Sequence, residues 1–483
     1  VATLGNDVIA SRPVNSVVDA MQGMIPGMNF SIGSGGGALN STAKFNIRGT
    51  GTIGSGSSVS PLVLIDGMEG DLNAVNPQDI DNISVLKDAA SASIYGSRAA
   101  GGVILVTTKS GKAGKTVVNY NNNFRFSSPQ NMPDQLDSYN WALYMNDASV
   151  NAGSGIWFTD TKLGQIKAAQ SDPTMQTMFE NDKGRWEIWD ANDLLPIANR
   201  DWLKSSFDTG FSQEHTVSAT GGNEKLQYYF SANYLGREGL LKYGEDTQDR
   251  YTITGKIDAQ IAPWVKFTYN TRFSRTDYTA PTMMDGLYYH NLCRYWPIIP
   301  VYDPNGNFVV TGSNPGDLIN GGTYKSQKDV QAHQFSVRLT PLKGLVVNAE
   351  MNYRVNHTMD HKDWLTTYGY DADNNPFVFN NPNDAVYEYA YKSNYFNPNI
   401  YAEYSFNLNE EHNFKVMAGY QSELLNQRWI SAEQYTIAAG LPTLNTTSKN
   451  PKVGGKYDSW STMGMFGRIN YDYKGKYLFE GNL

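Results

Sequence analysis

Two adjacent glycines, Gly101 and Gly102, stand beside the apolar run Val103–Thr108 in IYGSRAAGGVILVTTKSG (Ile94–Gly111), a pattern that could bind a phosphate. A phosphate-binding loop needs a strand, a glycine-rich turn and then a helix whose N-terminal N–H groups point at the anion. We expect the reverse order here, because Asp81–Ala100 carries apolar and small residues at helical spacing. The two glycines are therefore predicted to end a helix and not to hold a nucleotide.

Three further segments match the residue types and spacing of known ligand-binding motifs. GTGTIG (Gly49–Gly54) fits a dinucleotide-binding pattern, but SGSSVSP follows it, where no helix can begin, so we expect a flexible loop. His357 and His361 have zinc-ligand spacing, yet they lack a third ligand and stand where a strand ends, which favours a solvated loop. Asp371 opens a calcium-like segment in which Pro376 replaces the required glycine. We expect no metal site and no cofactor.

Aromatic side chains can bind a ligand without catalysing a reaction. Sugar rings stack their C–H faces on indole and phenol rings, while neighbouring Asn and Asp accept hydroxyl protons. Ten aromatic residues concentrate in the apparent long connections and are our candidate substrate-binding residues: Trp157, Trp186, Trp189, Tyr288, Tyr289, Tyr295, Trp296, Trp364, Tyr368 and Tyr370. For each of them the alternative is packing of the loops against one another or against another protein. No Ser/His/Asp arrangement or carboxylate pair stands out, so the sequence does not indicate an enzyme.

Composition limits the class of protein. The 483 residues carry a formal net charge of -8, which excludes a basic nucleic-acid-binding surface. A single cysteine, Cys293, excludes a disulfide framework and a cysteine-based zinc site. No apolar run reaches about 18 residues, and no signal peptide follows Val1, so the signal of an exported protein would lie upstream. The 31 tyrosines and 45 glycines favour β structure with long polar loops.

From about Thr116 onward, apolar and polar residues alternate. In Val347–Val355 the apolar residues are separated by Asn348, Glu350, Asn352 and Arg354. The same alternation marks other segments: Val265–Phe273, Ile400–Leu408, Tyr251–Ile261, Leu226–Tyr234, Phe335–Leu339, Phe414–Tyr420 and Met463–Tyr473. Each strand would have one face suited to lipid and one suited to water, and charges occur on a single face only.

The connections between about eleven predicted strands alternate between long and short, which is typical of outer-membrane barrels and not of a sandwich. The tight turns lie at Gly221–Lys225 and near Ala262, Pro341, Asn407 and Lys474. The longer loops are predicted over Ser127–Ser212, Gly236–Asp249, Tyr278–Lys328, Met359–Tyr391 and Leu425–Asp458. Since single-chain bacterial barrels close with even strand counts, we expect an unfinished barrel whose remaining strands follow Leu483.

Aromatic residues at the strand ends are placed as an interfacial girdle requires. These residues are Tyr228, Tyr234, Trp264, Tyr269, Phe273, Tyr404, Tyr471 and Tyr473. A single aromatic residue in a strand is explained by β propensity alone, so only their collective placement indicates a membrane.

Long motifs in the first 115 residues carry a family resemblance. They run over Pro61–Lys112, Val17–Phe30 (VVDAMQGMIPGMNF) and Phe45–Gly51 (FNIRGTG), and they closely resemble the plug domain of SusC/RagA-type TonB-dependent outer-membrane transporters. Asn199–Gly222 resembles that family's entry into its second barrel strand. The resemblance covers essentially the whole chain, strongly in the plug and more loosely in the barrel.

This resemblance implies an all-β transmembrane barrel of about 22 strands when complete, about 11 of them present here, with an N-terminal α+β plug domain in the lumen. We expect the plug over residues 1–115, and the N-terminal half of the barrel with its long extracellular loops over 116–483. The family further implies a location in the bacterial outer membrane and a SusD-like surface lipoprotein as a lid. The family also leaves room for a dimer of transporter–lipoprotein pairs. Energy would come from the TonB complex and the proton-motive force, through a short TonB-binding motif upstream of this chain.

Several plug residues have a physical interpretation beside the resemblance. Asp66 and Gly67 are expected to form a turn, Asp79 to cap the predicted helix, and Arg48 and Arg98 to pair with carboxylates of the enclosing wall. The wall carboxylates considered are Glu350, Asp258, Glu403 and Asp472. Pairing of the two arginines within the plug is the alternative. Gly101 and Gly102 would let the next strand pack closely, so a bulky residue at Gly102 should impair plug folding.

The predicted function is TonB-dependent active import of glycan oligosaccharides or peptides. One alternative is a plugged receptor or adhesin that binds ligand without importing it. A second alternative, a secreted polysaccharide-acting enzyme, predicts paired carboxylates at a cleft, and none are visible in the sequence.

Overall fold

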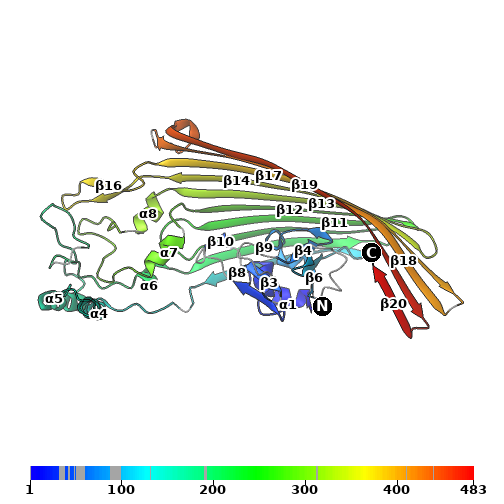
Figure 1. The fold of residues 1–483 in the computed structure, drawn as a ribbon, viewed down its shortest axis with the longest axis horizontal. Coiled ribbons are helices and arrows are strands. Elements are labelled where there is room, and N and C mark those ends of the chain that lie inside the picture. The colour runs from blue at the N-terminus through cyan, green and yellow to red at the C-terminus, as the bar shows by residue number, and fades with distance from the viewer. Residues whose placement is uncertain are drawn as a thin grey trace.

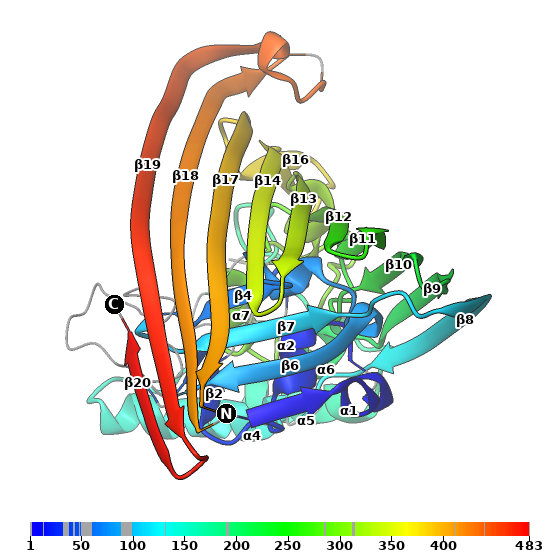
Figure 2. The same cartoon turned by 90° about the vertical axis from the view of Figure 1, so that its right-hand side faces the viewer.

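The computed structural model describes residues 2–482 except 13, 32–37, 42–43, 48, 50–59, 88–98, 131, 190–192, 285, 312–313, 410 and 439. A five-stranded sheet near the N-terminus lies beneath an eleven-stranded sheet that arches over it (Figure 1, Figure 2). The long connections of the large sheet, with most of the helices, gather at one end of the molecule.

The small domain is built on a mixed sheet of order β1-β6-β7-β4-β5, in which β4 and β7 are parallel. Its strands are β1 (Ala2–Gly5), β4 (Leu62–Ile65), β5 (Met68–Glu69), β6 (Ile80–Leu86) and β7 (Val103–Thr108). Its described residues also form a hairpin and four short helical segments: β2 (Met28–Ser31), β3 (Lys44–Ile47), α1 (Asn6–Ser11), α2 (Val17–Met21), η1 (Leu72–Ala74) and η2 (Pro77–Asp79). Val17, Ile83 and Ile104 are fully buried between the helices and the sheet, so this domain has a hydrophobic core of its own.

The predicted helix over Asp81–Ala100 is wrong in its first turns, because Ile80–Leu86 forms strand β6. The sequence shows apolar residues at helical spacing, but Ile83 and Val85 are β-branched and both are buried between β1 and β7. The rest of the predicted helix falls mostly on residues 88–98, which lie outside the described residues.

Gly102 lies at the start of β7 in a conformation that a side chain rarely adopts, with φ of +89°. Its N–H donates to the carbonyl of Ala99, and an added Cβ would lie 2.8 Å from Ile47 Cδ1 and 3.1 Å from the Leu86 carbonyl oxygen. Both the backbone angle and the close contacts therefore require glycine at this position.

The large sheet is entirely antiparallel and contains eleven strands, which confirms the predicted fold class. They are β8 (Gly114–Ser127), β9 (Gly210–Gly222), β10 (Leu226–Glu238), β11 (Thr247–Ala262), β12 (Val265–Pro281), β13 (Thr323–Leu342), β14 (Leu345–Trp364), β17 (Ala385–Leu408), β18 (His412–Ile437), β19 (Thr447–Tyr473) and β20 (Tyr477–Asn482). All five predicted tight turns join neighbouring strands at one rim of this sheet.

The long connections at the other rim hold helices and one small hairpin. These elements are α4 (Ser138–Asn151), α5 (Asp160–Ser171), α6 (Trp202–Ser206), α7 (Gly286–Leu292), α8 (Pro315–Asn320), η4 (Leu444–Thr446), β15 (Thr367–Tyr370) and β16 (Pro376–Asn380). Within the described ranges, no helix is both long and apolar enough to cross a bilayer.

The strands run further toward this rim than predicted. His357 and His361 belong to β14 and not to a loop, so that prediction is wrong. The strands lengthen across the sheet, from 13 residues in β10 to 27 in β19, and their upper parts carry polar residues on both faces. A clear alternation of apolar and polar residues ends before the strand does, which is why the sequence placed the loops too early.

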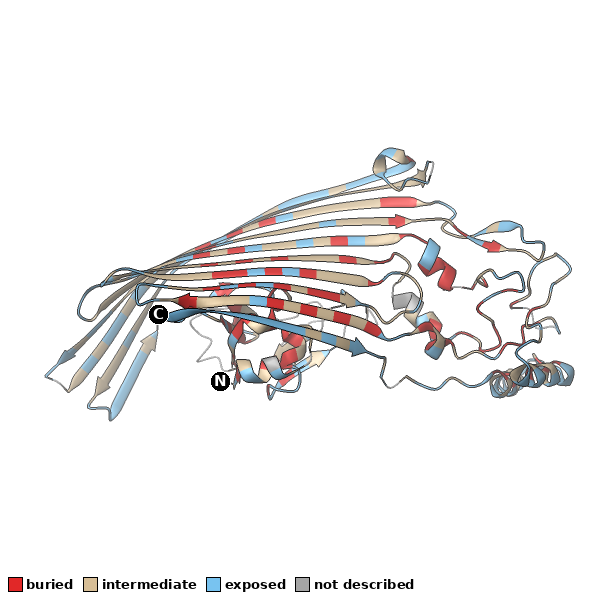
Figure 3. Cartoon of the chain, turned by 180° about the vertical axis from the view of Figure 1, so that it is seen from behind, coloured by how far each residue is buried: buried red, intermediate tan, exposed pale blue. Residues whose placement is uncertain are grey.

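Buried and exposed residues alternate along many strands of the large sheet (Figure 3), and the two faces are inverted relative to a soluble protein. On the outward face, Ile253 is 55% exposed, Ile400 is 50% exposed and Met465 is 86% exposed. On the inward face, over the small domain, Thr254 and Asn352 are buried. Apolar side chains that face out and polar side chains that face in are the pattern of a barrel wall in lipid.

Candidate functional site

The contact between the small domain and the wall is centred on two carboxylates of the small domain. Asp79 ends η2 and is 1% exposed. Its two oxygens accept hydrogen bonds from the hydroxyl groups of Tyr229 and Thr254, each at 2.8 Å, and both donors lie on the inward face of the wall. Asp79 therefore does not cap a helix, as the sequence suggested, but joins the small domain to the wall.

Asp66 lies at the tip of the turn between β4 and β5, with a φ of 50°. Its carboxylate accepts hydrogen bonds from the backbone N–H and the hydroxyl of Thr108, which hold it within the small domain. The same carboxylate accepts a hydrogen bond from Asn270 Nδ2 at 2.8 Å and lies 3.8 Å from Lys256 Nζ. Its carbonyl accepts a further bond from Gln334, so three strands of the wall hold this one residue.

Arginines of the wall reach backbone carbonyls of the small domain. Arg250 is buried and donates to the carbonyl of Asn73 at 3.0 Å, and Arg354 donates to the carbonyl of Glu69. Arg125 bonds Asn15 Oδ1 at 2.9 Å while it forms an ion pair with Glu214 of the wall. These guanidinium groups fix the small domain without requiring a particular side chain on it.

The described contacts have the opposite charge arrangement to the predicted one. Arg48 and Arg98, which we expected to pair with wall carboxylates, lie outside the described residues. Two of the wall carboxylates considered form ion pairs within the wall, Asp258 with Lys266 and Glu403 with Lys415. In most of the described contacts the small domain supplies the acceptors, and the wall supplies cations, amides and hydroxyl groups as donors. An exception is Asn76, whose Nδ2 donates to the Thr216 hydroxyl at 3.5 Å.

A second candidate site lies among the long loops, where Trp296 is at the centre of an aromatic cluster. Its ring centroid lies 5.2 Å from that of Trp141, 5.5 Å from Trp157 and 5.0 Å from Trp189. Tyr295 packs on the buried Trp202 at 4.9 Å. The candidates Trp157, Tyr295 and Trp296 are thus part of a hydrophobic core that joins loops distant in sequence.

Other predicted aromatics line an open hollow beside this cluster, which we call the loop hollow. Its volume is about 310 Å³, and Trp186, Trp189 and Tyr370 contribute rings from two loops. Trp189 is 53% exposed, so one of its faces is free for a ligand. The charged residues Arg185 and Asp303 also line the loop hollow, which combines aromatic faces with polar groups.

The remaining predicted residues are spread over the rim. Tyr289 stacks against Phe207 at 6.4 Å, Tyr368 is exposed on β15, and Trp364 ends β14. The side chain of Tyr288 lies outside the described residues. Sequence reasoning missed the phenylalanines of the loop hollow, because it counted only residues with a polar edge; they are Phe308, Phe377 and Phe379.

Lys162 in α5 is a buried cation within the loops. Its Nζ donates to the carbonyl of Leu195 at 3.1 Å and lies 4.3 Å from the centroid of the Phe179 ring. Burial lowers the pKa of Lys162 from 10.5 to about 8, while the nearby Asp193 acts in the opposite direction. Burial within the loop core thus brings the pKa of this lysine toward neutral pH.

The histidine and aspartate motifs take part in local bonding. His361 interacts with Glu388 at 2.7 Å and with Asp363 at 3.2 Å, and Asp371 accepts the N–H of Asn375 in a turn. No group of three or more His, Cys, Asp or Glu residues that could hold a metal ion occurs in the described part of the chain.

Comparison with known proteins identifies both parts of the fold. Residues 1–103 match the family model of the TonB-dependent receptor plug domain. The chain is 25% identical to TonB-dependent receptor P26 of Formosa agariphila, over 99% of the chain and 45% of that protein. It is 26% identical to TonB-dependent receptor SusC of Bacteroides thetaiotaomicron, over 98% of the chain and 45% of that protein. It thus spans about half the length of these relatives.

A solved structure supports the same fold. The structure of the RagAB peptide transporter superimposes with a TM-score of 0.80 at 22% identity, over 99% of this chain and 54% of that one. With a plug beneath an inverted eleven-stranded wall, the chain is similar to TonB-dependent receptors, which are proteins of the bacterial outer membrane. Among these receptors, it is similar in sequence to SusC and shares the fold of the RagAB structure.

We predict that neutralising the two plug carboxylates loosens the plug. In the full-length protein, Asp66→Asn with Asp79→Asn keeps the side-chain shapes but removes the charge, and hydrogen bonds to charged groups contribute about 1.5–3 kcal/mol each. Single-channel recordings in planar bilayers should show more frequent openings. Asp258→Asn is the matched control, since the described partners of Asp258 are Lys266 and Thr268 of the wall; equally rare openings in both variants would contradict the anchoring role.

We predict that the loop core becomes more stable as pH rises from about 8 to about 10.5. The folded pKa of Lys162 is the lower one, so in this window the unfolded chain binds more protons than the folded chain. The urea midpoint of the loops, followed by tryptophan fluorescence, should therefore increase with pH. Lys162→Met removes the titrating group and should abolish the increase; the same pH dependence in both proteins would refute the assignment.

Proposed function

We propose that the protein to which this chain belongs imports nutrients actively across the outer membrane. The observation that carries this proposal is the seal: buried carboxylates and carbonyls of the plug are bonded to the inward face of the wall. A barrel of the expected size would leak if its lumen were open. The plug must therefore move or rearrange for any cargo to pass, and that movement requires energy.

The contacts are suited to a plug that is pulled. The wall strands are joined by continuous backbone ladders, whereas the plug is joined to the wall by separate side-chain bonds. Such bonds contribute about 1 kcal/mol each when neutral, because water replaces the partner on release. They can break one after another while the wall stays intact.

The N-terminal strand offers an entry point for a pull. β1 lies at the edge of the plug sheet and pairs with β6 through only four residues, Ala2 to Gly5. A force applied upstream of Ala2 would act on this edge first, before it reaches the central strands. We propose that the TonB complex supplies the force, using the proton-motive force across the inner membrane.

The cargo that the loop hollow supports is an oligosaccharide or a peptide. Trp186, Trp189 and Tyr370 offer ring faces to sugar rings or to apolar side chains, and Arg185 and Asp303 offer charge to polar groups. One relative is SusC, and the structural neighbour is described as a peptide transporter. We favour glycan pieces on the aromatic lining, and the titration below tests both classes.

A SusD-like lipoprotein would close over the long-loop rim. Helix α4 exposes apolar side chains there, with Tyr144 60% exposed and Val150 54% exposed. Exposed apolar residues on one loop helix are a suitable contact for a protein lid.

We predict that uptake depends on energy. A strain that relies on the full-length protein for a single oligosaccharide should stop growing on it when the inner-membrane energiser is deleted, but should still bind it at the surface. Growth of the same strain on a monosaccharide, which is small enough to pass through porins, is the control. Undiminished growth on the oligosaccharide would instead identify a receptor or adhesin that does not import.

We predict that Trp189→Ala and Tyr370→Ala each weaken cargo binding about 10-fold, since each removes a ring from the centre of the loop hollow. Calorimetric titration of the full-length protein with oligosaccharides and with peptides measures this. Trp264→Ala is the control, because Trp264 is similarly exposed, at 50%, but lies at the tight-turn rim. Equal affinity of all three variants and the parent would refute the hollow as the binding site.

A further inference from the structure

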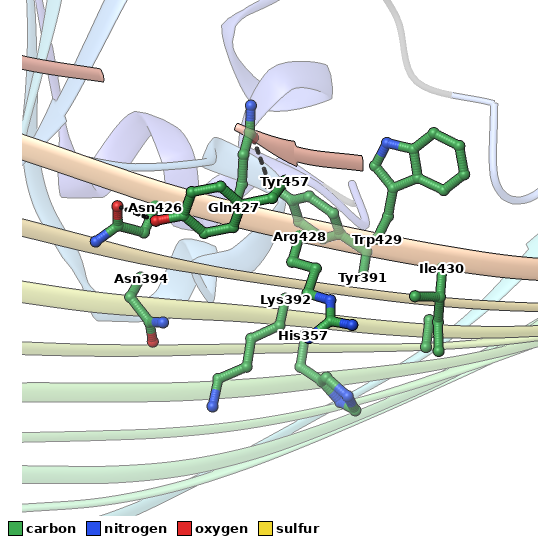
Figure 4. Close-up of a pocket in the computed structure, with 11 residues that line it drawn as sticks. His357, Tyr391, Lys392, Asn394, Asn426, Gln427, Arg428, Trp429, Ile430 and Tyr457 are labelled. Carbon is green, nitrogen blue, oxygen red and sulfur yellow. Dashed lines mark hydrogen bonds between the residues drawn. The ribbon is translucent and has the colours of Figure 1, made fainter. Parts of the chain in front are cut away.

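The outward face of the wall contains a hollow of about 450 Å³ formed by β14, β17, β18 and β19. His357, Lys392, Arg428 and Tyr457 are paired neighbours across these four strands, so their side chains share one face. Figure 4 shows Lys392, Arg428 and His357 on one side of the strands, with Trp429 on the opposite side. We call these four residues, with Asn394 and Asn426, the outer hollow.

The outer hollow lies at the edge of the apolar belt. On β17 the outward residues Ile400 and Phe396 are exposed and apolar, and Lys392 follows on the same face after Asn394. On β18, Leu424 precedes Arg428 in the same way. This is the level at which acyl chains give way to headgroups, where basic residues are favoured next to anionic lipids.

Both cations lack partners in the described part of the chain. No ion pair or side-chain hydrogen bond joins Lys392 or Arg428 to any described residue, and both side chains are exposed. The nearest acids on the same face have partners: Asp329 forms a bidentate pair with Arg275, and Glu388 bonds His361. The two charges are therefore available to a ligand.

The amides of the outer hollow are oriented as donors. Asn426 Oδ1 accepts hydrogen bonds from the hydroxyls of Tyr457 at 3.1 Å and Ser459 at 2.7 Å. Asn394 Oδ1 accepts the Tyr353 hydroxyl at 3.3 Å. Since both amide oxygens are occupied, the free NH₂ groups add donors beside the two cations, and a site rich in donors and cations selects an anion with several oxygens.

We propose that the outer hollow binds the phosphorylated headgroup of an outer-leaflet lipid. The phosphate would lie between Lys392 and Arg428, and its acyl chains would run down the apolar belt over Phe396 and Leu424. A free phosphate has no chain to bury, so the belt makes the site specific for a lipid. This site is separate from the loop hollow and does not depend on what the protein imports.

The test uses the full-length protein in detergent, with short-chain phosphatidic acid as the probe, measured by native mass spectrometry and calorimetric titration. Lys392→Gln with Arg428→Gln should weaken binding about 30-fold, since two cations near the membrane surface are removed. Lys325→Gln with Lys449→Gln is the matched control, because it removes the same charge from exposed positions outside the outer hollow. It should bind as the parent does.

Three further measurements make the outcome decisive. Lys392→Arg keeps the charge and should bind like the parent, and the gel mobility of heated and unheated protein shows whether each variant is folded. Inorganic phosphate and short-chain phosphatidylcholine should bind at least 10-fold more weakly than phosphatidic acid. Equal binding of inorganic phosphate would mean a free-anion site, and unchanged binding by the folded double glutamine variant would mean no site; either result overturns the proposal.

Discussion

The structure depends on one constraint, which is that a wall in lipid must satisfy every backbone polar group internally and show apolar side chains outward. The nine inner strands of the sheet meet the first requirement through ladders on both of their edges, and the edge strands β8 and β20 are each paired on one side. The alternation of side chains meets the second, with Ile253 and Ile400 facing out while Thr254 and Asn352 face in. A shift of one residue in any register would reverse both faces of that strand, so the alternation also fixes the pairing.

The polar inward face in turn determines how the plug is held. A polar wall offers hydroxyl, amide and guanidinium donors, and a domain enclosed by it gains most by presenting acceptors. Asp66, Asp79 and the backbone carbonyls of Asn73 and Glu69 do so. The plug keeps its own hydrophobic core around Ile83 and can therefore remain folded when these bonds are released.

The sequence is most informative where a single rule controls the structure. The tight turns and the strand count follow from alternation and loop length, and the structure confirms them. The strand ends at the long-loop rim lie beyond the predicted ones, because the alternation fades before the strand ends. Strand β6 was missed because its buried residues Ile83 and Leu86 stand three residues apart, a spacing that also fits a helix, so only the neighbouring strands decide its form. The wall partners of Asp66 and Asp79 were also missed, since contacts between residues 150 or more positions apart depend on register across several strands. Likewise, the sequence shows that the tryptophans lie in the long connections. Only the fold shows that Trp296 is packed in the cluster while Trp189 is half exposed.

The uneven strand lengths make the mouth of the wall oblique. β10 ends at Glu238, four residues past Tyr234, whereas β19 begins at Thr447, ten residues before Tyr457, which lies in the same row of the ladder as Tyr234. The difference of six residues corresponds to roughly 20 Å along a strand, so the β19 side of the wall stands higher than the β10 side, as an upright screen. The inner side of this screen carries Tyr389 and Trp429, whose ring centroids are 6.1 Å apart. An aromatic surface thus lines the inner side of the taller part of the wall, where a passing molecule meets it before it reaches the plug.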